Sequence, residues 1–233
     1  MKVIAITAHP DDAEVHCAGT LLRCRERGDR VEIFIATNGD KGFSDMEESR
    51  RKTIRLQEAR AAGEYGGMPV TWMGFSDGEV DTGLLAREKI QDCIRRADPD
   101  VILTHAPFDY HPDHVAVSQL VVSACFTATV PLCASKEPAI ERIPQIYYID
   151  TYSGIGFIPT VYVDISSVME KKLGMMRCHK SQIEWLQTHD HLDVLHMMEV
   201  IAQYRGYQCG VPYAEGFIQH KAGLYLSAQR LLP

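Results

Sequence analysis

Residues 3–14 of the 233-residue chain read VIAITAHPDDAE, an apolar run that ends abruptly in a histidine, a proline and two aspartates. The apolar part, Val3 to Thr7, is typical of a strand that is buried on both faces, as strands of parallel sheets are. A helix is predicted to follow it as far as Arg27, with Gly28 as its stop. A buried strand followed by a helix is the repeating unit of an α/β fold.

The same alternation continues along the chain. Further strands are predicted at residues 31–37, 70–75, 101–104, 147–150 and 161–165. Helices are predicted at about 46–64, at 84–97 and from His111-Pro112 onward, and about 167–207 is expected to be mainly helical. This pattern predicts a Rossmann-like α/β sandwich, with a mostly parallel sheet and helices on both faces. In such folds, ligands bind beyond the carboxyl ends of the strands.

Composition narrows the classes of function. A formal charge of -7 and a pI of about 5.8 argue against a nucleic-acid partner, because binding phosphates requires a basic surface. The chain has no run of 18 apolar residues, so no membrane span is expected. The seven cysteines include no Cys-x-x-Cys pair and are read as reduced thiols of a cytoplasmic protein. The length suits a single domain over residues 1–233.

The first polar cluster follows the first strand and contains His9, Asp11 and Asp12. Burying charge is costly unless the charge is paired or binds a metal, and imidazole with carboxylate is an ordinary zinc ligand set. Since neighbouring aspartates point in different directions, one can bind the metal while the other faces a substrate. The alternative is a helix cap, a role that aspartate also performs well. The glycine fingerprint of dinucleotide-binding folds is missing here.

The second polar cluster, DYHPDH at residues 109–114, follows the strand at 101–104. Its two histidines, His111 and His114, are three residues apart across a helix start, so both can face one point. For either histidine alone, an ordinary loop residue is the alternative. The two clusters lie at the ends of different strands of the same predicted sheet, which favours a shared site.

Together the clusters can supply a catalytic zinc site, which takes three protein ligands and keeps one position for water. His9, Asp12 and His114 would be the ligands. His111 would lie beside the metal, where it can hold a developing oxyanion or protonate a leaving amine. Asp113 could fix the tautomer of His111.

At these residues the chain resembles the LmbE-like, or PIG-L, zinc-dependent N-deacetylases. The resemblance spans nearly the whole chain and rests on these stretches: HPDDAE at 9–14 with Gly19-Thr20, HPDH at 111–114, Arg55 with Glu58-Ala59, HKSQ at 179–182, and YAEGF at 213–217. It implies one deacetylase domain of Rossmann-like fold, with zinc on His9, Asp12 and His114. It also implies Asp11 as general base and His111 as the group that stabilises transition-state charge.

The implied function is a zinc-dependent hydrolase that removes an N-acetyl group from a GlcNAc-type sugar or sugar conjugate by attack of metal-activated water. A homo-oligomer is expected on the resemblance alone. Two alternatives stay open. One is a zinc amidohydrolase or deacylase of a non-sugar substrate. The other is a non-catalytic metal-binding protein.

Two further residues are candidates for binding substrate. Arg55 lies on a highly charged helix and could belong to a solvated face, but the resemblance implies contact with a substrate hydroxyl or carboxylate. Tyr213 could form a pocket wall or belong to the core. Two departures from the family pattern, His16 and Asp40, leave the shape of the substrate pocket open.

Overall fold

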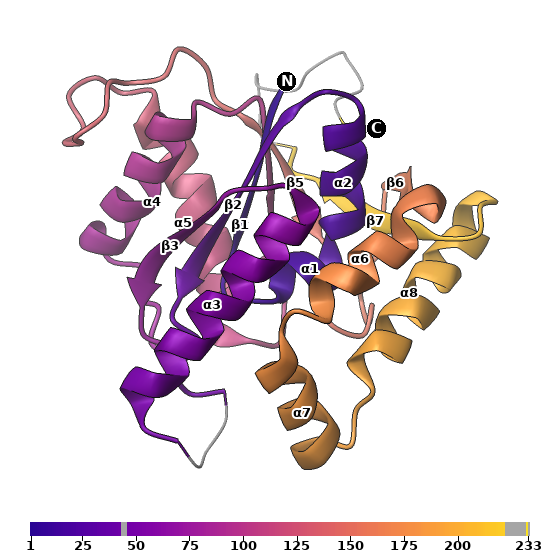
Figure 1. The fold of residues 1–233 in the computed structure, drawn as a ribbon. Helices are drawn as coiled ribbons and strands as arrows, with labels where there is room; N and C mark the ends of the chain where they lie inside the picture. The colour runs from indigo at the N-terminus through magenta and orange to yellow at the C-terminus, as the bar shows by residue number, and fades with distance from the viewer. Residues whose placement is uncertain (43–45, 222–231, 233) are drawn as a thin grey trace.

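The computed structural model describes residues 1–42, 46–221 and 232. Figure 1 shows a twisted sheet between two layers of helices. The seven strands, in chain order, are β1 (Lys2–Thr7), β2 (Arg30–Thr37), β3 (Val70–Phe75), β4 (Val101–Thr104), β5 (Gln145–Ile149), β6 (Val161–Asp164) and β7 (Ala214–Gln219).

The strand order in the sheet is β3-β2-β1-β4-β5-β7-β6. Strands β1 to β5 pair in parallel, whereas β7 is antiparallel to both of its neighbours, β5 and β6. The sheet is therefore mostly parallel, and the predicted fold class is confirmed. The order reverses direction at β1, so β1 and β4 are neighbours whose carboxyl ends open onto one crevice, as in other doubly wound sheets.

Alternate residues of each strand enter two separate cores. In β1, Val3 and Ala5 belong to one core, and Ile4 and Ile6 belong to the other. The first core is covered by α1 (Asp12–His16), α2 (Ala18–Glu26), α3 (Glu48–Gly66), α6 (Met169–Met176), α7 (Lys180–His189) and α8 (Val194–Cys209). The second core is covered by α4 (Leu84–Ala97) and α5 (Pro112–Ala128).

The first predicted helix is interrupted. Instead of running unbroken to Arg27, it divides at Cys17, whose φ of -146° is not helical. The break creates a fresh helix start, and there the amides of Gly19 and Thr20 donate to the buried carboxylate of Glu215 at 2.9 and 2.7 Å. An anion is stabilised at a helix N-terminus. A side chain at Gly19 would stand 2.7 Å from Ile165, which accounts for glycine in this position.

Strand β7 was not predicted from the sequence, and residues 167–207 are divided into more elements than the mainly helical region that was expected. Strand β7 carries Glu215 and Gly216 in its interior, and both residue types weaken a strand pattern. The region beginning at Ser166 contains a short 3-10 turn, η1 (Ser166–Val168), and then α6, α7 and α8 with breaks between them. The start of α8 is capped by Asp193, which accepts from the amide of His196 at 3.0 Å.

Within the described residues, no helix is long and apolar enough to cross a membrane.

Candidate active site

The two polar clusters meet at the carboxyl edge of the sheet, as expected. His9 and Asp12 follow β1, and His114 lies in the first turn of α5, which follows β4. His9 Nδ1 is 3.2 Å from His114 Nε2 and 3.4 Å from Asp12 Oδ2. His114 Nε2 is also 3.4 Å from Asp12 Oδ1. These three side chains are called the His–Asp cluster below.

The spacing of the His–Asp cluster fits a shared metal ion. Ligand atoms about 2.0–2.1 Å from a tetrahedral zinc are about 3.4 Å from one another. The two imidazole nitrogens of His9 and His114 face each other, and only a shared proton or a cation can satisfy both lone pairs. One nitrogen from each histidine and a carboxylate oxygen are donors that zinc accepts. The residues present therefore fit zinc. Among the described residues, three groups have ligand atoms that all lie within 4.8 Å of one another: His9, His111 and His114; Asp12, His105 and His114; and His9, Asp77 and Asp113.

His105, to which no role was assigned from the sequence, packs against the His–Asp cluster. Its Nε2 accepts the amide hydrogen of Ala8 at 2.9 Å, and its ring stacks on that of His114 with centroids 3.8 Å apart. Complete burial, followed by the charge of His114, lowers the pKa of His105 to about 4. His105 Nε2 also lies 3.1 Å from Asp12 Oδ2, so His105 forms a further group with Asp12 and His114 whose ligand atoms could hold a metal ion.

Carboxylates orient the two histidines of the cluster. Asp109 Oδ2 lies 3.1 Å from Nδ1 of His114, so the opposite nitrogen points at the cluster centre. His9 Nε2 contacts Asp113 Oδ2 at 3.2 Å and Asp77 Oδ1 at 3.1 Å. Asp77, in the turn after β3, had no distinguishing signal in the sequence beyond an Asp-Gly pair at a strand end.

The contacts of Asp113 differ from those expected. Its carboxylate accepts from the amides of Gly78 and Val80 and reaches His9, whereas only its backbone amide donates to His111 Nδ1, at 3.2 Å. Because Nδ1 of His111 accepts this hydrogen, the ring carries its own hydrogen on Nε2. The tautomer of His111 is thus set by the main chain at the start of α5.

Asp11 lies beside the cluster and makes no helix-capping bond with its side chain. Its Oδ1 accepts from Arg55 Nη2 at 3.0 Å, and Arg55 Nη1 donates to Gln182 on α7. Arg55 is only 2% exposed, so it is no part of a solvated helix face. The structure brings Asp11 and Arg55 together as a buried ion pair at the wall of the site.

Asp40 and His16, the two departures from the family pattern, also have defined places. Asp40 is buried and accepts from the amide of Asp77 and the hydroxyl of Ser76, so it shapes the turn that carries Asp77. His16 is buried, and burial lowers its pKa to about 3, which makes it a neutral core residue. Its ring lies 6.2 Å from that of Tyr152.

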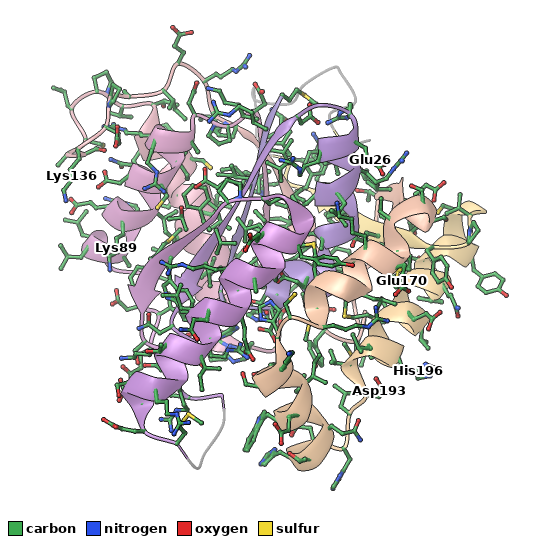
Figure 2. All side chains as sticks on the ribbon, viewed as in Figure 1. Glu26, Lys89, Lys136, Glu170, Asp193 and His196 are labelled. Atoms are coloured by element: carbon green, nitrogen blue, oxygen red, sulfur yellow. The ribbon has the colours of Figure 1, made fainter. Side chains whose placement is uncertain are left out.

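One cavity contains most of the predicted site. Its lining, in the described part of the chain, is His9, Asp11, Asp12, Gly42, Arg55, Asp77, Tyr110, His111, His114, Tyr152, Gln182, Trp185, Leu186 and Asp190. Tyr213 is not among these residues, and its hydroxyl donates to Glu199 at 3.1 Å. His196, read from the sequence as a helix residue, is exposed at the edge of the molecule (Figure 2).

The fold and the site define an α/β protein with histidines and aspartates that could hold a metal ion at the switch point of a mostly parallel sheet. Residues 4–125 match the family model described as PIG-L: GlcNAc-PI de-N-acetylase, and the chain belongs to this family.

Individual relatives carry different activities in their names. The chain is 31% identical to diacetylchitobiose deacetylase of Thermococcus kodakarensis, over 97% of this chain and 85% of the relative. It is 24% identical to 4-oxalmesaconate hydratase of Pseudomonas putida, over 78% and 74% of the two chains. The solved N,N'-diacetylchitobiose deacetylase of Pyrococcus horikoshii has the same fold, with a TM-score of 0.82 at 24% identity, over 94% of this chain and 83% of that one.

Proposed function

We propose that this chain is a zinc-dependent hydrolase that removes the N-acetyl group from a GlcNAc-type sugar or sugar conjugate. The observation that carries the proposal is the approach of His9, Asp12 and His114 to within 3.4 Å, with the carboxylate of Asp11 in the same cavity. Membership of a de-N-acetylase family and the identity to a diacetylchitobiose deacetylase support the acetyl group and the sugar.

His9, Asp12 and His114 would hold the zinc, which when bound lowers the pKa of a water to roughly 7 and polarises the amide carbonyl. Asp11 acts as the general base. Arg55 fixes one of its oxygens by a hydrogen bond, which orients the carboxylate and leaves the second oxygen to take the proton of the attacking water. Asp11 then holds this proton and can pass it to the departing nitrogen.

His111 stabilises the negative charge that develops on the carbonyl oxygen of the substrate. Its hydrogen lies on Nε2 because Nδ1 accepts from the amide of Asp113. Donors that are already aimed at a developing oxyanion need no rearrangement during the reaction. The carboxylate of Asp113 orients His9, whose ring lies 4.5 Å from that of His111.

Arg55 is proposed to act at the substrate pocket through its position in the wall, where it holds Asp11 and meets Gln182. Tyr213 is proposed as a wall residue on the resemblance alone. In the structure its hydroxyl is directed to Glu199.

The test is release of acetate from N,N'-diacetylchitobiose by protein loaded with zinc, compared with protein treated with a chelator. Acetate released only by the zinc-loaded protein is the expected result. Release from N-acetyl amino acids but from no sugar would favour the non-sugar amidohydrolase. Hydration of 4-oxalmesaconate, the compound in the name of one relative, would favour a lyase instead. No reaction in any assay with zinc bound would favour a metal-binding protein.

We also propose that residues 1–233 form one domain, and that the protein is a cytoplasmic homo-oligomer. Exposed apolar side chains near the cavity support the subunit contact: Phe108, Ile155 and Ile158 are 52%, 82% and 80% exposed. Phe108 packs near Phe157, with ring centroids 6.2 Å apart. Light scattering should give a mass above 26.2 kDa, and Ile155→Asp together with Ile158→Asp should lower it. A monomer at working concentration would contradict this proposal.

A further inference from the structure

The cavity has two chemically different parts. One is the His–Asp cluster with Asp11 and His111. The other is contributed by α7 and two loops, and its lining is aromatic and acidic: Tyr110, Tyr152, Trp185, Leu186 and Asp190. The proposed reaction uses only the first part. The second part is therefore where the rest of a substrate, beyond its acetamido group, must lie.

Positive charge available to a substrate is scarce around this cavity. Among the lining residues that the structure describes, Arg55 is the one lysine or arginine. Its guanidinium is 2% exposed and already donates to Asp11 and Gln182. Its buried Nε has no hydrogen-bond partner among the described residues. A carboxylate of a substrate that bound through Nη2 would have to compete with Asp11, and winning that competition would release the proposed general base.

Two lysines on segments that also contribute to the cavity lining are engaged: Lys41, next to Gly42, and Lys52, on the same helix as Arg55. Lys41 pairs with Glu79. Lys52 pairs with Glu48 at 2.5 Å and lies 3.4 Å from Asp40. Each of these ammonium groups has a carboxylate partner on the protein, so none stands free to receive an anionic substrate.

Negative charge, by contrast, is present in the outer part. The Asp190 side chain is 47% exposed and lines the cavity, with one oxygen 2.7 Å from His189 Nδ1. A half-exposed carboxylate can accept hydrogen bonds from sugar hydroxyls, but it repels a substrate carboxylate or phosphate.

The aromatic residues provide a surface for a sugar ring. Trp185 stacks on His189, with ring centroids 4.1 Å apart and an angle of 16° between the planes. One face of the indole is thus covered, and its remaining surface borders the cavity. Tyr110 and Tyr152 lie with their rings 6.3 Å apart on the same cavity. Aromatic faces carry partial negative charge and suit the C–H groups of a pyranose.

We propose that this cavity selects uncharged N-acetylated glycosides, with Trp185 as the platform for the sugar and Asp190 as an acceptor for its hydroxyls, and that it discriminates against conjugates with a carboxylate or phosphate next to the acetylated sugar. The proposal rests on the proposed deacetylase function. On this proposal the cavity accepts a neutral disaccharide such as diacetylchitobiose, which appears in the name of one relative. It disfavours acidic compounds such as 4-oxalmesaconate, which appears in the name of another.

The kinetic test compares N-acetylglucosaminyl L-malate with its dimethyl ester, which has the same skeleton without the charge. At low ionic strength, where charges are least screened, kcat/KM for the ester should exceed that for the acid by about tenfold or more. Asp190→Asn should reduce this ratio severalfold. The matched control is Glu26→Gln, which removes one charge at the far end of α2, away from the cavity (Figure 2), and should leave the ratio unchanged.

A binding test needs no catalysis. The chain has two tryptophans, Trp72 and Trp185. In a Trp72→Phe variant, the fluorescence of Trp185 should change when N,N'-diacetylchitobiose is added, and it should change much less with N-acetylglucosaminyl L-malate at the same concentration. Trp185→Ala should raise KM for the disaccharide with less effect on kcat.

The outcomes distinguish the two proposals. If acetate is released but the acid is turned over as well as its ester, the charge selectivity is refuted and the deacetylase function stands. If the disaccharide changes the Trp185 fluorescence but no substrate loses acetate, the proposed function fails while the sugar platform stands. An unchanged fluorescence with every sugar refutes the platform.

Discussion

Among the buried charged side chains that the structure describes, two groups are built on opposite plans. One is the His–Asp cluster at the strand ends. The other, called here the β7 cluster, lies beside the last strand and contains Asp150, Lys172, Arg205 and Glu215, all 5% exposed or less. The charged side chains of both groups are buried, so burial alone does not distinguish a binding site from a structural group.

In the β7 cluster, charges and donors balance. Glu215 accepts from Lys172 at 2.6 Å and from two amides at the start of α2. Asp150 accepts from Arg205 through Nε at 2.7 Å and Nη2 at 3.0 Å, and from the amide of Thr151. Each carboxylate faces a cation of the chain, so nothing further is needed to satisfy the cluster.

In the His–Asp cluster, charges and donors do not balance. His9 and His114 turn ring nitrogens toward each other at 3.2 Å, and Asp12 stands within 3.4 Å of both. Asp12 Oδ2 accepts from the backbone amide of His9 at 2.6 Å and lies 3.1 Å from His105, but no lysine or arginine among the described residues pairs with this cluster. A buried charge therefore indicates a binding site only where donors and acceptors are mismatched. A matched set indicates a structural role.

The largest expected effect comes from removing a member of the mismatched set. His114→Ala should lose zinc and with it essentially all acetate release, because two remaining donors hold zinc poorly. Elemental analysis beside the activity assay checks this. A variant that retains a full equivalent of zinc would show that the ligands are other side chains, with His105 and His111 the nearest candidates.

Asp11→Asn is expected to separate binding from chemistry. The variant should keep zinc, because Asp11 is proposed to lie outside the ligand set, but kcat should fall on the order of 10²–10⁴-fold since the amide cannot take a proton. Zinc content and kcat are measured on the same preparation. Normal activity would overturn the general-base role, and a zinc-free variant would place Asp11 among the ligands.

Lys172→Met tests the matched set in the same way. It should leave zinc binding intact but cost about 3–5 kcal/mol of folding free energy, because Glu215 then stays buried without its cation. Urea unfolding measures the loss. Lys171→Met, one residue earlier on α6 and exposed, is the control and should change stability little. Equal stability of the two variants would mean that the pair contributes nothing.

The smallest effect is expected for Tyr213→Phe. Losing the hydrogen bond from its hydroxyl to Glu199 should cost about 1 kcal/mol of stability. KM should stay unchanged, because the hydroxyl is directed to Glu199 and the ring that would form the pocket wall is kept in phenylalanine. A clear rise in KM would show that the hydroxyl itself contacts the substrate.

The sequence was a good guide wherever a pattern depends on near neighbours. The strand ends that carry His9 and His114 follow from hydrophobic runs and from the rule that parallel strands place their carboxyl ends together. The same reasoning selected the expected ligands His9, Asp12 and His114, because each of them adjoins a strand end or a helix start.

The features that were not predicted from the sequence depend on contacts between distant segments. Nothing near Asp113 indicates that its carboxylate turns to His9 instead of His111, because the deciding amides, Gly78 and Val80, belong to another loop. The amides that follow the break at Cys17 likewise find their acceptor in Glu215, almost two hundred residues later. Local propensity does not encode such partners.

The place of β7 has a consequence for the order in which the molecule can be assembled. It is the last strand in the chain, yet it lies between β5 and β6. During synthesis, β6 cannot join the sheet until residues 214–219 have emerged, and until then β5 presents an open edge that can pair with another chain. The amides at the start of α2, which are synthesised some two hundred residues earlier, also lack their acceptor until Glu215 has emerged. A nascent chain arrested before residue 214 should therefore be prone to aggregation, even though five parallel strands are already in place.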